Sequence, residues 1–464
     1  MITPSCSRFR SGLAFWAAAA ASALAQSVYW EVSPFLTLTE PREWKLTVRL
    51  QVDNFEDENV VPGYHEHPAK SIDAAGGTVL FPIVPATSQA QVFLNRVEAE
   101  LRLNDELVDD EPKIYVDRGE GKPLPAGTFL AELAFGPYPG IREMSLQITT
   151  IGRSWETIYN EAKAAEVDWP KELPPVLRTL FEPELFIDRG PARPYDLTPI
   201  KEHVREWTQG QPRSQPPAVT AKWIAMRVAE TYRPSGRGYS GPVGESSNNV
   251  PVSVFGAFHV DGPEFAILNR RGSKFNLPLL LVACYRAAGI PARLVIGYDD
   301  SERTRNASEI GERLYCWVEF ALYDERETDE KKRLTWIPVD ILQLQASSAW
   351  TQPFDRPTEY FGTSDDWDRF IPIAFHFTPY WVPGVSYGRY LFETEEARRY
   401  HLDRRPPLQG RLLPDFAPAL WSWNVRPAPP RWAGQWLDFI KDAPQRSAVD
   451  PLPIEVRHGA APRP

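Results

Sequence analysis

Ser273 and Lys274 are adjacent, and a serine hydroxyl beside a lysine amine could act as nucleophile and base in a hydrolase. The same serine stands where a loop meets an apolar run, a position at which serine commonly caps a helix. These two residues alone leave both interpretations open. A lysine side chain offers no thiolate, and its ammonium group is disfavoured at a helix N-terminus.

Cys284 and Cys316 are the only cysteines after the first few residues of the chain. Cys284 follows Lys274 by ten residues, roughly 15 Å along a helix that rises 1.5 Å per residue. We expect both thiols to be buried as small apolar groups. Whether they pair stays open, because the sequence does not give the distance between them.

His65 and His67 flank Glu66 with a spacing found in metal sites. No other cluster of ligand-type residues accompanies them in the sequence, so we interpret this segment as a surface loop. We expect neither a metal nor another cofactor.

The elements that would position Lys274 follow it directly. Residues 276–288 predict a buried helix, and Pro278 fits only near its start because proline lacks an N–H group. Gly289-Ile290-Pro291-Ala292-Arg293 then breaks the helix. Hydrophobic periodicity predicts the remaining elements of this region: a helix at 219–232 and strands at 293–297, 314–323 and 334–339.

Residues 219–345 resemble the core of the transglutaminase-like (papain-like) superfamily. The resemblance rests on the run RAAGIPARLVIGY, on the aromatic-Val-Glu segment at 315–319 and on Trp336-Ile337-Pro338-Val339-Asp340, in the family's order. It implies that the family's nucleophilic cysteine falls on Lys274, its histidine on Tyr315 and its aspartate on Asp340. Gly272, Ser273 and Trp317 are implied neighbours in the cleft.

Two of these three positions depart from the family's pattern, which closes the family's acyl-transfer mechanism. A tyrosine hydroxyl, with a pKa near 10, cannot replace a histidine base near neutral pH. We expect Lys274, Tyr315 and Asp340 to converge in the fold. We also expect Asp340 to compensate the Lys274 charge, directly or through the Tyr315 hydroxyl.

The chain as a whole predicts an α+β protein with an N-terminal all-β part. Alternating runs, with a hairpin turn at Asn104-Asp105, favour a β-sandwich-like domain. In the next segment, Trp155–Glu166 is interpreted as a helix. The expected organisation is a signal peptide at 1–25, a β-sandwich-like domain at 26–150, a helical and Pro-rich connector at 151–215, a transglutaminase-like core at 216–345, a Pro- and aromatic-rich extension packing on the core at 346–442 and a disordered tail at 443–464.

Charge and hydropathy restrict the partners. The net charge is −10, with 51 Lys and Arg against 61 Asp and Glu, and no basic stripe is present, so a nucleic-acid partner is not expected. Cleavage near Ala25 would leave an exported protein, periplasmic or extracellular. No later run is long enough for an integral membrane segment.

These observations favour an exported, non-catalytic protein that uses its cleft or β domain to bind a peptide, glycan or protein partner. One alternative is an active hydrolase or acyltransferase, protease- or transglutaminase-like, with a Ser273/Lys274 or other non-standard site. A structural envelope protein is a further possibility.

Overall fold

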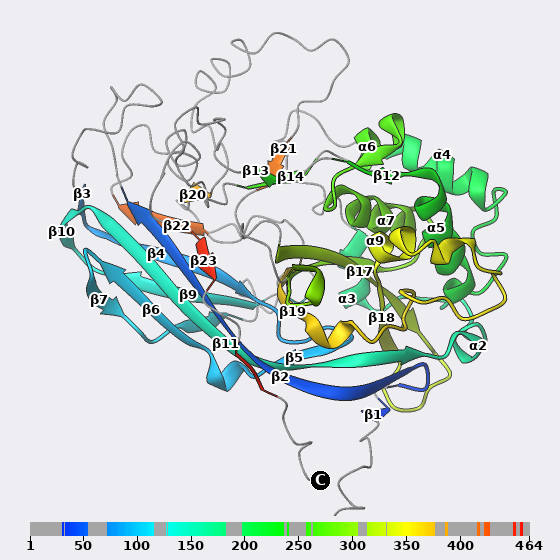
Figure 1. Ribbon diagram of the computed structural model, residues 1–464, viewed down its shortest axis with the longest axis horizontal. Helices are drawn as coiled ribbons and strands as arrows, with labels where there is room; N and C mark the ends of the chain where they lie inside the picture. The colour runs from blue at the N-terminus through cyan, green and yellow to red at the C-terminus, as the bar shows by residue number, and fades with distance from the viewer. Residues whose placement is uncertain are drawn as a thin grey trace, which may run out of the picture.

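The computed structural model describes most of the chain between residues 30 and 375, with short strands beyond. The described residues are 30–31, 33–53, 72–115, 127, 129–181, 197–235, 239–240, 257–260, 263–304, 313–330, 332–375, 386–387, 415–417, 422–426, 449–451 and 455–457. The fold is mixed α/β with mostly strands (Figure 1). The expected signal peptide and the His65/His67 segment lie outside the described residues.

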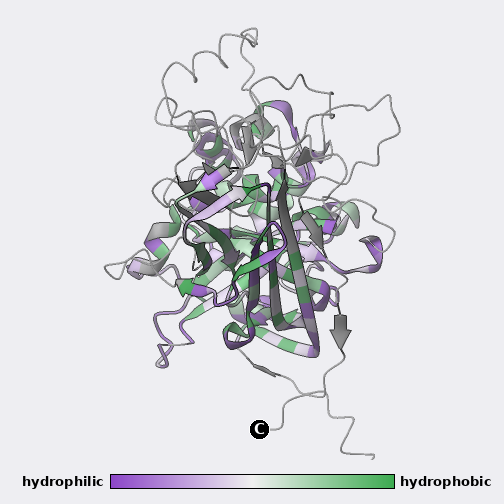
Figure 2. Ribbon diagram, turned by 90° about the vertical axis from the view of Figure 1, so that its left-hand side faces the viewer, coloured by the Kyte–Doolittle hydropathy of each residue, from purple (hydrophilic) through white to green (hydrophobic). Residues whose placement is uncertain are grey.

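Two long antiparallel strands, β2 (Leu36–Asp53) and β11 (Glu143–Tyr159), dominate the N-terminal half. Buried Met144, Leu146 and Ile148 alternate with less buried residues along β11, and Figure 2 shows such alternation of hydrophobic and polar residues along the strands. These strands belong to an eight-stranded sheet whose other members are β1 (Trp30–Glu31), β5 (Ala90–Val92), β6 (Glu98–Leu103), β7 (Glu106–Asp109), β23 (Val449–Pro451) and β24 (Glu455–Arg457).

A second sheet has five strands, two of them from the C-terminal part of the chain. Its order is β20 (Ser386–Tyr387), β22 (Ser422–Arg426), β4 (Gly76–Ile83), β9 (Phe129–Phe135) and β8 (Lys113–Tyr115). Buried side chains of both sheets, such as Leu133 and Leu146, belong to one apolar cluster. That the two sheets form a β-sandwich domain stays a prediction, as does disorder of the tail outside β23 and β24.

The turn at Asn104-Asp105 is confirmed as a hairpin. It joins β6 to β7 with positive φ angles of 49° and 67° at its two central residues, as a type I′ turn requires. The helix expected at Trp155–Glu166 is wrong. There β11 continues to Tyr159 through a register shift near Ser154, and only α2 (Glu161–Ala164) is helical. Pairing with β2 outweighed the helical pattern.

The second half of the fold is a four-stranded antiparallel sheet covered by helices. The strand order is β18 (Leu334–Val339), β17 (Leu314–Tyr323), β16 (Ala292–Asp299) and β19 (Phe370–Phe375). The main helices are α4 (Thr198–Trp207), α5 (Pro217–Thr231), α6 (Pro263–Asn269), α7 (Asn276–Ala287) and α9 (Ile341–Ala346). The predicted bounds of β17 and β18 are confirmed, and α5, α7 and β16 differ from prediction by two residues or fewer.

Strand β17 is buried because it is covered on both faces. Phe320 packs against Tyr285 of α7 on one face, with ring centroids 5.6 Å apart. On the other face, Glu319 accepts a hydrogen bond from the backbone N–H of Ser88, in the N-terminal half. The bend before β5 therefore contacts this face of the helix-bearing sheet.

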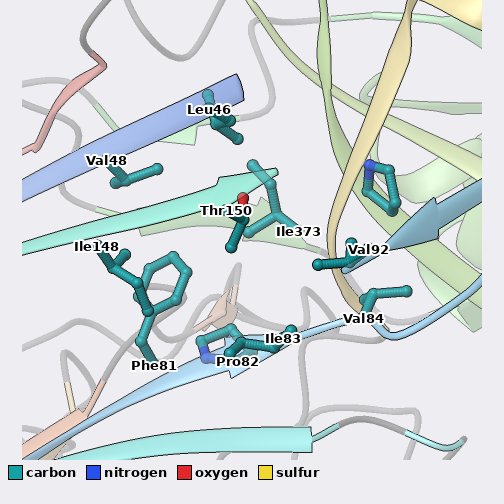
Figure 3. Close-up of a pocket in the computed structure, with 11 residues that line it drawn as sticks. Leu46, Val48, Phe81, Pro82, Ile83, Val84, Val92, Ile148, Thr150 and Ile373 are labelled. Atoms are coloured by element: carbon teal, nitrogen blue, oxygen red, sulfur yellow. The ribbon is translucent and has the colours of Figure 1, made fainter. Parts of the chain in front are cut away.

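Strand β19 also contacts the N-terminal sheets, where a small apolar pocket of about 10 Å³, room for at most about one water molecule, lies between them (Figure 3). Pro372 and Ile373 of β19 line it together with Leu46, Val48, Phe81, Pro82, Ile83, Val84, Val92, Ile148 and Thr150. Nearly all of these side chains are apolar, and the little space left between them shows that the two halves pack closely here.

Candidate functional site

Asp340 stands at the junction of β18 and α9, where it caps the helix. Its Oδ1 accepts hydrogen bonds from the backbone N–H groups of Leu342 and Gln343, at 3.1 and 3.0 Å. Its own N–H donates to the carbonyl of Tyr360. The carboxylate is 2% exposed. Burial, the largest cause, raises the pKa of Asp340 to about 6, although these hydrogen bonds act in the opposite direction.

Tyr315, near the start of β17, is brought to Asp340 by the pairing of β17 with β18. Its hydroxyl donates to Asp340 Oδ1 at 2.8 Å and lies 3.0 Å from Oδ2. Its ring stacks on Phe370, with centroids 5.1 Å apart. Burial, reinforced by the Asp340 charge, raises the pKa of Tyr315 well above its ordinary value. The hydroxyl therefore stays protonated at neutral pH and serves as a donor.

Lys274 lies immediately before α7 and is half-buried. Its Nζ is 5.1 Å from the ring centroid of Phe275. Its charge acts on the thiol of Cys316, the residue after Tyr315, and opposes the rise in that thiol's pKa. Lys274 therefore lies close enough to the start of β17 to influence it electrostatically.

Ser273 and Gly272 shape the turn into α7. The Ser273 hydroxyl accepts from the backbone N–H groups of Phe275 and Asn276, both at 3.2 Å, and the side chain is 6% exposed. A Cβ on Gly272 would lie 2.8 Å from Cβ of Asn276, so this close approach requires glycine. The Ser273 hydroxyl thus accepts hydrogen bonds from backbone N–H groups two and three residues later, as the side chain of a capping residue does.

Trp317 is fully buried on the same face of β17 as Tyr315. Its ring lies 5.8 Å from Phe370 and 5.9 Å from Trp367. A Cβ on Gly297 of the neighbouring strand would overlap the Trp317 ring. Trp317 therefore packs against Phe370, the ring on which Tyr315 stacks.

Arg303, in the short 3-10 helix η5 (Glu302–Thr304), is the site residue that sequence reasoning missed. Its guanidinium carbon lies 5.6 Å from the Tyr315 ring centroid and 5.3 Å from that of Phe370. It pairs with Asp299 at 3.5 Å and with Asp366 at 3.4 Å. Asp299 ends strand β16 and does not share a helix with Arg303, so their four-residue spacing gave no helical pairing signal. Arg303 also opposes the rise in the pKa of Asp340, the effect that we had expected of Lys274.

Neither cysteine is placed for catalysis. Both are free and buried, and burial raises the pKa of each thiol well above its ordinary value. A thiolate is therefore scarce at neutral pH. Among the described residues, no group of three or more His, Cys, Asp or Glu side chains is placed to hold a metal. Within the same part of the chain, no helix is long and apolar enough to span a bilayer.

Asp340 and Asp368 are expected to make stability depend on pH. Burial, the largest cause for both, raises each folded-state pKa from 3.8 to about 6. The stabilising contribution is therefore complete below about pH 4 and is lost as pH rises through 6. Asp368→Asn removes one such group, and Asp368 Oδ1 has no hydrogen-bond partner to lose.

We expect the variant to gain about 1–2 kcal/mol relative to the wild type between pH 4 and pH 7. Urea unfolding at four pH values measures the difference. A constant difference across this range would contradict the assignment.

Comparisons with known proteins relate one segment of the chain to a known family. Residues 249–341 match the family model described as the transglutaminase-like superfamily, within the segment whose sequence carried the resemblance. The solved structure of "a Putative Cysteine Protease from Cytophaga hutchinsonii" is similar at 11% identity, covers 73% of this chain and 83% of its own, and has a TM-score of 0.40. That of "a putative protease from Parabacteroides distasonis ATCC 8503" is 11% identical, with coverages of 62% and 64% and a TM-score of 0.21. No curated protein matches at a significant level.

Proposed function

We propose, for a chain that carries a transglutaminase-like domain at residues 249–341, an exported protein in which this domain binds a partner without catalysing acyl transfer. One observation carries the proposal. Lys274 stands at the position matched to the nucleophile, while the Tyr315 hydroxyl at the histidine position is committed as a donor to Asp340.

The chemistry of these side chains supports the proposal. Acyl transfer through a cysteine needs a thiolate and a base that accepts its proton near neutral pH. A protonated tyrosine bound to a carboxylate cannot take that proton, and the two thiols of the core are buried with raised pKa values. The positions matched to the family's histidine and aspartate still form a hydrogen-bonded pair, Tyr315 with Asp340, while Lys274 stands at the nucleophile position.

The alternative of a Ser273/Lys274 hydrolase has less support. The Ser273 hydroxyl is occupied by two backbone N–H groups and is almost inaccessible to solvent. A nucleophile needs a base within hydrogen-bond reach and room for a substrate carbonyl. We therefore assign Ser273 to stabilising the turn that leads into α7. Export is proposed from the basic and apolar residues at 1–25 alone.

The double substitution Lys274→Cys with Tyr315→His is expected to create a reactive thiol. A cysteine at the start of α7 beside a histidine held by Asp340 would have a lowered thiol pKa, about 4–7.5 in comparable settings. Iodoacetamide labelling, followed by mass spectrometry across pH, measures it in a Cys284→Ala, Cys316→Ala background. The same background with native Lys274 and Tyr315 should show no labelling at this site.

A direct assay tests the absence of activity. Purified wild-type protein is expected to turn over neither amide nor ester substrates and not to react with a fluorophosphonate probe. Turnover that disappears in folded Ser273→Ala or Lys274→Met variants would overturn the non-catalytic proposal.

A further inference from the structure

Arg303 lies in a set of groups that together suit a cation. We call the rings of Tyr315 and Phe370 and the carboxylates of Asp299 and Asp366 the Arg303 cage. The two rings stack at an interplanar angle of 20° and lie within 6 Å of the guanidinium carbon, the range of cation–π attraction. Burial acts to lower the pKa of Arg303, but the negative charges of Asp299, Asp340 and Asp366 favour the charged guanidinium, and the pKa is raised.

The contacts of Arg303 are longer than those of a second arginine of the same fold. Arg293 binds Glu319 at 2.6 and 2.7 Å and lies 3.9 and 4.0 Å from the Trp336 and Phe375 ring centroids. Its side chain is 8% exposed. Arg303, by contrast, is 31% exposed, and both of its ion pairs are longer than the 2.7–2.9 Å usual for a charge-assisted hydrogen bond. Arg293 is therefore enclosed by close contacts, whereas Arg303 is more exposed and its contacts are longer.

The Arg303 cage is exposed on the side of Asp366. The side chain of Asp366 is 33% exposed, whereas that of Asp299 is 2% exposed. A guanidinium entering beside Asp366 would meet the same rings and carboxylates that Arg303 now contacts. The planar guanidinium suits this arrangement better than a lysine ammonium, because it stacks on rings and bonds carboxylates at the same time.

We propose that the Arg303 cage is a binding site for an arginine side chain of a peptide partner, and that Arg303 occupies it as an internal stand-in until the partner arrives. The inference rests on the proposed binding function and names its ligand class. The partner must displace Arg303 before it can bind. The apparent affinity of the partner is therefore its intrinsic affinity multiplied by the fraction of molecules in which the cage is open.

The first experiment empties the cage and refills it. Arg303→Ala is expected to bind methylguanidinium in a saturable manner, with a concentration-dependent rise in Tm that the wild type does not show. Methylurea, a neutral planar analogue, should give no such rise. Arg326→Ala is the matched control, because Arg326 is 58% exposed and paired with Asp324 outside the site. Equal responses to the two compounds, or an equal response of Arg326→Ala, would overturn the proposal.

The second experiment uses the wild-type protein and needs no destabilised variant. The tripeptide acetyl-Gly-Arg-Gly-amide is expected to bind at least about tenfold more tightly than its citrulline counterpart, which keeps the shape but lacks the charge. Asp366→Asn should reduce this preference. A preference below about twofold, or one unchanged in Asp366→Asn, would overturn the proposal.

These outcomes are separate from those that test the proposed function. Loss of the arginine preference leaves the absence of turnover unaffected. Conversely, turnover by the wild-type protein would overturn the non-catalytic proposal even where the arginine preference is found.

Discussion

Glu319→Ala is expected to lower the free energy of unfolding by about 3–5 kcal/mol, the range found when one partner of a buried ion pair is removed. Glu319 is 0% exposed, and its Oε2 binds Arg293 at 2.6 and 2.7 Å. Its Oε1 accepts from the backbone N–H of Ser88 at 2.6 Å and from the Ser88 hydroxyl at 2.5 Å. The substitution therefore strands a buried guanidinium and a buried N–H together.

Urea unfolding measures the loss, and two further variants identify its origin. Ser88→Ala removes only the hydroxyl donor and should cost about 1 kcal/mol. The pair Glu319→Leu with Arg293→Met removes both charges and should recover most of the stability lost in Glu319→Ala. If the double variant is no more stable than Glu319→Ala, the stranded charge is not the cause.

Asp340→Ala is expected to cost about 3 kcal/mol, the sum of a lost helix cap and an unsatisfied buried hydroxyl. The substitution frees the N–H groups of Leu342 and Gln343 at the start of α9 and leaves the Tyr315 hydroxyl without its acceptor. Tyr315→Phe removes only the last of these contacts. It should therefore cost less than Asp340→Ala.

A double-mutant cycle between these two substitutions measures their coupling. Because Tyr315 has nothing to donate to once Asp340 is gone, the double variant should be more stable than additivity predicts by about 1–2 kcal/mol. Additive losses within about 0.5 kcal/mol would mean that the hydrogen bond contributes nothing. A parallel cycle that combines Lys274→Met with Asp340→Ala tests the expected coupling of Lys274 to Asp340. Arg303, whose charge acts on the pKa of Asp340, is the residue with which Lys274 is compared.

The sequence by itself determined the elements of the helix-bearing sheet. An uninterrupted apolar run specified α7, Gly289 ended it with a φ of +87°, and β17 and β18 have the predicted bounds. These features depend on interactions between residues close in the chain. The order of motifs then carried the family resemblance, and with it the pairing of Tyr315 with Asp340.

Only the tertiary structure decided which partner each buried charged group binds. Ser88 lies 231 residues before Glu319, and Arg42 binds Asp300 across 258 residues. Strand β11 runs on to Tyr159, into the segment expected to be a helix, because β2 pairs with it there. Short strands after residue 380 complete both N-terminal sheets. A charge or a strand edge accepts many partners of the right kind, so local pattern cannot select one; burial does, because an unpaired polar group inside the fold costs free energy.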